Sequence, residues 1–393
     1  MKNLKKIRKK TKTTKTTKTA IMTKIICICF ILCLSLNFVC ATEIEQVADE
    51  TDLDSLINVL EEYSNEDIDI EEMSQSLING EGIDYGVIGN FVINKLFYEI
   101  RLGLKSSVSI LIIIVLMAVI NSLELEKDSN ISKVTNLTGF LVIVTIILKT
   151  YMTMLTDFIG TIDIITKIIE IIAPFMLALL IATGEVVTSG IISPVLLFVT
   201  SLIGVLINYI ILPLLNVSLI FKLISNMADG VKLNKFSSLF SKTAMWIISV
   251  VFTIFLAVME LESTLACSID EVTIKTTQAA VSNLIPVVGK FVSDSIEVVM
   301  GASEVIGKSV GIIGIVIILV SAIIPIIKLT INMIVNFVLA AIAEVLDTDS
   351  KIINLCEDMS KQYKTLLGIM IGVMVTFVIG LAIIIKLMGR IAV

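Results

Sequence analysis

The chain has 393 residues, of which 56% are hydrophobic and only 17% are charged. Soluble proteins carry about 25% charged residues and disordered chains need low hydrophobicity, so the composition excludes both classes. Histidine is absent, which excludes Ser-His and Cys-His catalysis and histidine-ligated metals. We therefore expect an all-α, polytopic membrane protein with no enzymatic activity and no cofactor or metal site.

The net charge of −6 is divided into blocks along the chain. Residues 1–41 contain ten Lys and Arg residues and no acidic residue. Residues 42–94 contain fifteen acidic residues and no Lys or Arg. The remainder is nearly neutral, so each block needs its own interpretation.

The first block is typical of a secretory signal. A basic, Thr-rich stretch ends at Lys24, and fifteen apolar residues follow, from Ile25 to Val39. That length is short for a spanning helix, which needs about 20 apolar residues. Small residues at the end of the run predict cleavage after Ala41, giving a signal peptide over residues 1–41. The alternative is an uncleaved membrane anchor.

Residues 42–104 are predicted to form an acidic extracytoplasmic segment, because translocated segments tolerate acidic residues while Lys and Arg tend to stay cytoplasmic. Leu53, Leu56, Ile57 and Leu60 follow helical spacing, which predicts a short amphipathic helix. Two interpretations of the segment are open: a docking surface for a basic or apolar partner, and a solvated acidic spacer.

Residues 105–393 are predicted to form a helical membrane domain, because long apolar runs alternate with short polar breaks. Backbone groups in lipid must pair internally, so helices are expected. The candidate spans are 106–123, 134–155, 168–188, 191–216, 243–261, 309–327, 329–346 and 365–387. We expect six to eight transmembrane helices.

Three further segments are amphipathic and predict helices that lie in the interface or pack on partner helices: 156–170, 222–242 and 279–305. In the first, Phe158, Ile162, Ile165 and Ile169 form one stripe. The second is rich in Lys. If the mature N-terminus is outside, four crossings before residue 222 would leave this basic segment outside as well, against the positive-inside tendency. One run between 156 and 216 would then have to be re-entrant or interfacial.

Two sets of residues are candidates for a special role. Pro286 and Gly289, with Lys290, interrupt an otherwise helical pattern, which predicts either a re-entrant gate or a kinked interfacial helix. Small-residue pairs with GxxxG spacing predict close helix packing, and their members are Gly307, Gly311, Gly368 and Gly372.

The membrane part carries landmarks in a specific order. They are Ala173–Leu180 (APFMLALL), Ser193–Phe198 (SPVLLF), Ile211–Leu215 (ILPLL), Lys275–Thr277, Leu284–Lys290 (LIPVVGK), Ser309–Gly314 and Pro325–Lys328. In this order and spacing the chain resembles the stage III sporulation protein AE family of endospore-forming bacteria. The resemblance is densest over residues 170–330; the Lys/Thr-rich head and the acidic stretch do not match closely.

The resemblance implies a role in the complex that links the mother cell to the engulfed forespore. Family members are expected in the mother-cell membrane around the forespore. The implied partners are the other stage III A-operon proteins, including a cytoplasmic ATPase and ring-forming proteins, and the stage II sporulation protein Q complex. This assembly is regarded as a channel or secretion-like apparatus that sustains late forespore gene expression. The resemblance supplies no catalytic residue.

The sequence is compatible with two functions from different classes. The first is a non-enzymatic membrane platform or conduit subunit, which contacts the bilayer and protein partners, binds no nucleic acid and can form homo-oligomers. The alternative is a stand-alone small-solute permease, which predicts an internal repeat and a polar site at the midplane. No clear repeat is visible, and Lys149 and Lys328 lie near the ends of predicted spans, which favours the first function.

Overall fold

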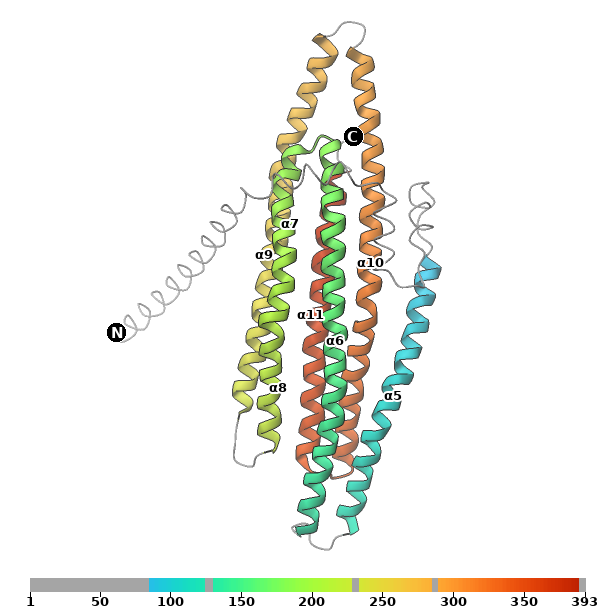
Figure 1. Cartoon of the computed structure of the whole chain (residues 1–393), viewed down its shortest axis with the longest axis vertical. Coiled ribbons are helices and arrows are strands. Elements are labelled where there is room, and N and C mark those ends of the chain that lie inside the picture. Colours follow the sequence, from blue (N-terminus) through green and yellow to red (C-terminus); the bar gives the residue numbers. More distant parts are fainter. Residues whose placement is uncertain (1–84, 124–129, 228–232, 285–288, 389–393) are drawn as a thin grey trace, which may run out of the picture.

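The computed structural model describes residues 85–123, 130–227, 233–284 and 289–388. These residues form long helices that run up and down a single elongated bundle (Figure 1), and none of them is in a β-strand. The predicted signal peptide and most of the acidic segment, including the predicted short helix at Leu53–Leu60, lie outside the described residues.

Six helical columns alternate in direction along the bundle (Figure 1). They are α5 (Tyr85–Leu123), α6 (Asn130–Ala182), α7 (Val186–Leu206) with α8 (Leu212–Met227), α9 (Asn234–Leu284), α10 (Gly289–Val345) and α11 (Ser350–Met388). All six columns contain a stretch long and apolar enough to cross a membrane. The prediction of an all-helical protein with six to eight spanning helices is therefore confirmed, and the described residues contain six such helices.

The number is six because runs predicted as separate spans are continuous helices. Residues 134–155 and 168–182 both belong to α6, and residues 309–327 and 329–345 both belong to α10. At 1.5 Å per residue, the 53 residues of α6 and 57 residues of α10 span about 80 and 86 Å, more than twice a 30 Å hydrocarbon core. The charged residues inside these runs do not end the helices, which continue through them.

The same continuity removes the conflict over the basic segment 222–242. Only three columns precede it, because 134–155 and 168–182 are one helix. The segment is not one amphipathic helix: it contains the end of α8 and the beginning of α9, which meet at the same end of the bundle as the α10–α11 turn (Figure 1). That end is opposite to the α6–α7 turn, so an external Tyr85 is compatible with a cytoplasmic basic segment.

A short turn between α6 and α7 and a π-helix between α7 and α8 shape the columns. Gly184, between α6 and α7, has a φ of 89°, and its amide donates a hydrogen bond to the carbonyl of Ile181 at 2.9 Å. A glycine adopts this left-handed conformation without a Cβ penalty, so the helix ends there. A π-helix, Ile207–Ile211, joins α7 to α8, and Pro213, two residues after it, lacks the amide that would continue the α-helical pattern.

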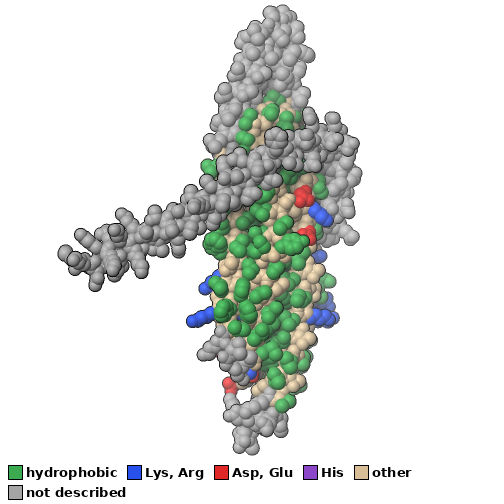
Figure 2. Space-filling view, turned by 60° about the vertical axis from the view of Figure 1, so that its left-hand side comes forward, with side chains coloured by type: hydrophobic (Ala, Val, Ile, Leu, Met, Phe, Trp, Pro, Cys, Tyr) green, Lys and Arg blue, Asp and Glu red, His purple; other side chains and the backbone are tan. Residues whose placement is uncertain are grey.

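The core lies where α10 packs against α11 and α6. The predicted apolar stripe of segment 156–170 is part of it: Phe158, Ile162, Ile165 and Ile169 are fully buried. This segment therefore packs on partner helices, which was one of the two arrangements expected. Figure 2 shows closely spaced hydrophobic side chains over one face of the outer surface, with Lys and Arg at its borders. Such a surface is typical of a bundle surrounded by lipid.

Candidate functional site

Charged side chains from three helices meet inside the bundle. The ammonium Nζ of Lys328 on α10 lies 2.8 Å from Oδ2 of Asp157 on α6 and 3.9 Å from Oε1 of Glu99 on α5. Glu99 is buried, while Lys328 and Asp157 are partly exposed. A buried carboxylate is costly unless it is paired, so the lysine stabilises Glu99 electrostatically and connects α5, α6 and α10.

Polar side chains continue from Lys328 along one face of α10. Asn332 donates to the carbonyl of Lys328 at 2.9 Å, and Asn336 donates to the carbonyl of Asn332 at 2.8 Å. The amide of Asn332 also approaches the sulfur of Met154 on α6 at 3.7 Å. The side-chain oxygen of Asn336 is buried and has no hydrogen-bond partner in the described part of the chain.

A second polar group joins α6, α8 and α11 in the core. The hydroxyl of Tyr151 donates to Oδ1 of Asn216 at 3.1 Å. Nε2 of Gln362 donates to the Tyr151 hydroxyl and to the carbonyl of Leu215, each at 3.2 Å. Tyr363 packs edge-on against Tyr151, with ring centroids 5.9 Å apart. These hydrogen bonds fix the relative position of α6, α8 and α11, although Oε1 of Gln362 and the Tyr363 hydroxyl have no hydrogen-bond partner among the described residues.

Three contacts attach α8 to its neighbours α9 and α11 near the basic end of the bundle. Lys222 forms an ion pair with Asp358 on α11 at 3.5 Å, and Asn226 donates to the same carboxylate at 3.4 Å. The buried hydroxyl of Ser218 donates to the carbonyl of Ser237 on α9 at 2.8 Å. These contacts connect α8 to both α9 and α11.

The predicted gate lies at the junction of α9 and α10. Pro286 is outside the described residues, and the side chain of Lys290 is also outside them. Gly289 is the first residue of α10. No described contact tests the gate, which stays a prediction.

The four GxxxG glycines are distributed over α10 and α11. Gly307 lies against Met388 and Leu179, and Gly311 lies against Met176 and Ile385. Gly372 faces Phe252 on α9, whereas Gly368 has only Met245 nearby. Three of the four glycines therefore occupy places where a Cβ would collide with a side chain of a neighbouring helix, and Gly368 does not.

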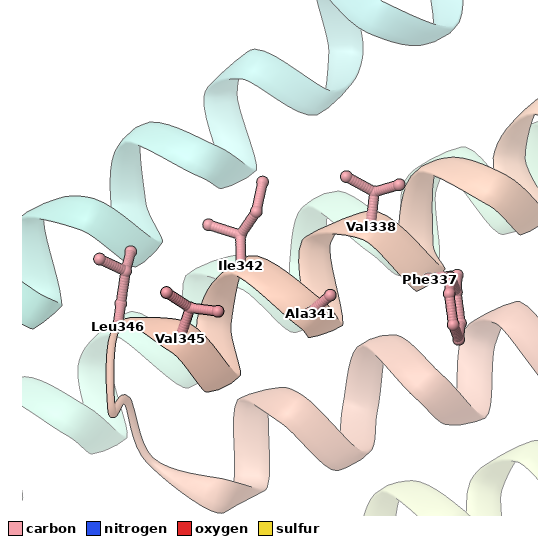
Figure 3. Close-up of a pocket in the computed structure, with 6 residues that line it drawn as sticks. All are labelled: Phe337, Val338, Ala341, Ile342, Val345 and Leu346. Atoms are coloured by element: carbon pink, nitrogen blue, oxygen red, sulfur yellow. The ribbon is translucent and has the colours of Figure 1, made fainter.

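The outer surface carries one apolar groove of about 300 Å³ beside the lower end of α10. Figure 3 shows its six lining side chains, all apolar: Phe337, Val338, Ala341, Ile342, Val345 and Leu346. Because no polar atom lines the groove, it suits a hydrocarbon chain and offers no group for chemistry. Among the described residues there is also no cluster of three Cys, Asp or Glu residues that could hold a metal ion.

Sequence reasoning missed the cluster around Lys328. It placed this lysine at the end of a span, where its ammonium would reach the interface, because a charge in an apolar run was taken as a break. The signal that could have found the cluster is the spacing of Lys328, Asn332 and Asn336, which puts three polar residues on one face of a helix. Their partners, Glu99 and Asp157, are distant in sequence and carry no comparable signal.

Comparison with known proteins identifies the family of this chain. A family model described as Stage III sporulation protein AE matches residues 68–388. A protein with that name from Bacillus subtilis (strain 168) is 28% identical over 234 residues, which are 59% of this chain and 59% of the relative. The chain thus aligns with less than two thirds of that relative's length. No solved structure matches. Since the family model covers every helix described above, the chain belongs to the stage III sporulation protein AE family.

Proposed function

We propose that the chain is a non-enzymatic, multi-pass subunit of the sporulation channel or secretion-like complex that links the mother cell and the forespore. It acts in the mother-cell membrane that surrounds the forespore, and it is required there for late forespore gene expression. Its partners are other stage III A-operon proteins and the stage II sporulation protein Q complex. The observation that carries the proposal is the family match over residues 68–388, which includes all six columns of spanning length.

The distribution of charge on the helices supports a membrane-embedded subunit. On α11, residues 365–385 contain no charged residue, and they lie between Lys364 and Lys386. These twenty-one residues cover about 32 Å, one hydrocarbon thickness. On α9, residues 243–259 are likewise free of charge between Lys242 and Glu260. Glu260 and Lys386 lie 3.9 Å apart, so the two stretches end at the same level.

The arrangement of polar groups supports a role without catalysis. The Tyr151–Gln362 group and the Lys328 ion pairs hold helices together, and they are not gathered at an open pocket. A catalytic site needs a nucleophile or acid–base pair beside space for a substrate. The described apolar groove provides the space but no such pair.

The test is deletion of the gene in its spore-forming host. We expect engulfed forespores that fail to activate late forespore genes, followed by recovery when the full-length chain is supplied from a second locus. Normal spore maturation in the deletion strain would contradict the proposal. A strain that carries only the segment up to residue 123 is the matched control for expression from that locus.

A stand-alone small-solute permease is the second candidate, and the ion pairs around Lys328 are the observation that favours it, since transporters place ionisable residues inside the bundle. The two functions differ in their dependence on partners. A permease stays evenly distributed in the mother-cell membrane when the other stage III A-operon proteins are deleted. A complex subunit tagged with a fluorescent protein gathers at the forespore only when those proteins are present.

A further inference from the structure

A row of exposed polar residues and one glycine follows the outer face of the middle part of α6, residues 145–170. The α6 polar stripe consists of Thr145, Lys149, Thr153, Thr156, Gly160, Asp163, Lys167 and Glu170, all exposed. Successive members are three or four residues apart, so they lie on one face of the helix. The opposite face carries the buried residues Phe158, Ile162, Ile165 and Ile169. One helix therefore separates the apolar core from a continuous polar surface.

This surface cannot face hydrocarbon. A membrane core is crossed by about 20 helical residues, and every window of that length in the apolar part of α6, Asn136–Ala182, contains a charged member of the stripe. Ionised groups at such depths are costly unless they face a partner or water. By contrast, residues 186–221 of α7 and α8 contain no charged residue at all, although their outer face is equally exposed. The exposed face of α6 therefore carries charges, whereas these residues of α7 and α8 carry none.

The threonines of the stripe and three of its four charged residues bond to no other helix in the described part of the chain. Its threonine hydroxyls bond to their own helix: Thr153 donates to the carbonyl of Lys149 and Thr156 to that of Met152, each at 3.2 Å. Lys149, Asp163 and Glu170 have no ion pair within the described part of the chain. Charges of both signs alternate along the stripe, which suits solvation by water and hydrated ions better than one charged partner.

We propose that the α6 polar stripe lines a water-filled path through the membrane. The inference rests on the proposed function and deepens it, because it names α6 as the helix of a conduit subunit that faces the conduit. The conduit would contain water and hydrophilic solutes of either charge. In this arrangement the apolar faces of α7, α8 and α11 lie toward lipid and α6 lies toward the path. The stripe extends over 26 residues, about 38 Å, so it covers one full hydrocarbon thickness.

The test is the reactivity of single cysteines toward a charged, membrane-impermeant thiol reagent in native membranes. The background is the full-length chain with its six cysteines replaced, five by Ser and the buried Cys356 by Ala. Gly160→Cys is the mildest stripe variant, because a Cβ at Gly160 meets nothing within 4 Å. Lys167→Cys and Glu170→Cys extend the measurement along the stripe.

Two exposed apolar positions serve as controls at matched depth. Gly204 on α7 faces Thr166, so Val205→Cys lies at the level of Lys167. Gly314 lies against both Ile172 and Leu381, so Ile379→Cys on α11 lies near the level of Glu170. We expect the stripe cysteines to react about tenfold faster or more than these controls, since thiolate is the reactive form and apolar surroundings suppress it.

Each variant is first tested for recovery of spore formation in the deletion strain. Equal, slow reaction of stripe and control cysteines in variants that restore sporulation overturns the water-filled path while leaving the proposed function intact. Disulfide formation between two Gly160→Cys chains, without reaction at Lys167→Cys or Glu170→Cys, also overturns it and makes the stripe an interface between copies. Normal sporulation of the deletion strain would contradict the proposed function. This result does not depend on the rates of cysteine labelling.

Discussion

Lys328 on α10 donates a hydrogen bond to Asp157 on α6 at 2.8 Å, although the two residues are 171 positions apart. Glu99 on α5 approaches the same ammonium from another helix, at 3.9 Å. The first column of the bundle is thereby connected to the central helices by charge as well as by packing. Because Glu99 is buried, its carboxylate needs the ion pair with Lys328 when α5 is packed in the bundle.

Replacement of the lysine is expected to destabilise the bundle. Lys328→Met leaves Glu99 buried without its partner, at a cost of about 1–3 kcal/mol, less than for a fully buried pair because Lys328 is partly exposed. The melting temperature of the purified full-length chain in detergent measures the loss. Lys386→Met is the control, since the Lys386–Glu260 pair is exposed and contributes about 0–1 kcal/mol.

A second change identifies the cause of that loss. Glu99→Gln in the Lys328→Met background removes the unpaired charge, so the melting temperature should recover in part. If the double variant is as unstable as the single one, the loss comes from packing of the lysine stem and the electrostatic explanation is wrong. Asp157→Asn alone should cost less than Lys328→Met, because Asp157 is more exposed than Glu99.

The ion pairs also show which parts of the fold the sequence could predict. Apolar runs predicted helices and their membrane environment, because both depend on composition within about 20 residues. They did not predict that α6 and α10 continue past Asp157 and Lys328, since a charge in an apolar run looks the same whether it ends a helix or pairs across the bundle. Pairing depends on tertiary contacts, so the boundaries and the candidate site needed the structure.

The GxxxG pairs give a prediction with an internal control. A Cβ at Gly311 would approach Met176 and Ile385 to 2.6 Å, whereas a Cβ at Gly368 has only Met245 at 3.7 Å. Gly311→Val should therefore destabilise the α6–α10–α11 contact by about 1–3 kcal/mol. Gly368→Ala should be neutral or stabilise the helix by up to about 1 kcal/mol. Melting temperatures compare the two, and equal effects would show that these glycines do not set the helix spacing.

The Tyr151 hydroxyl is the centre of the second polar group. Tyr151→Phe keeps the ring against Tyr363 but removes the donor to Asn216 and one of the two acceptors of the buried Gln362 amide. A buried polar group left unsatisfied costs about 1–3 kcal/mol, so the melting temperature should fall. Tyr209→Phe is the matched control, because Tyr209 is exposed and should tolerate the loss of its hydroxyl. Similar melting temperatures for both variants would mean that water replaces the missing hydroxyl.

The alternating columns predict the side of the membrane on which each end lies. The end of α8 and the start of α9 carry Lys222, Lys235 and Lys242, and the positive-inside tendency puts them in the cytoplasm. In intact vegetative cells that express the cysteine-free chain, Lys235→Cys should resist a membrane-impermeant thiol reagent until the membrane is permeabilised. Val186→Cys, exposed at the opposite end of the bundle, should react at once.

Ser350→Cys provides the check on the number of crossings. Ser350 begins α11 at the same end of the bundle as the start of α9 (Figure 1), so it must behave as Lys235→Cys does. Reaction of Lys235→Cys with protection of Val186→Cys would reverse the orientation and keep the six crossings. Disagreement between Ser350→Cys and Lys235→Cys would instead contradict them, because α9 and α10 together cross the membrane twice and return the chain to the same side.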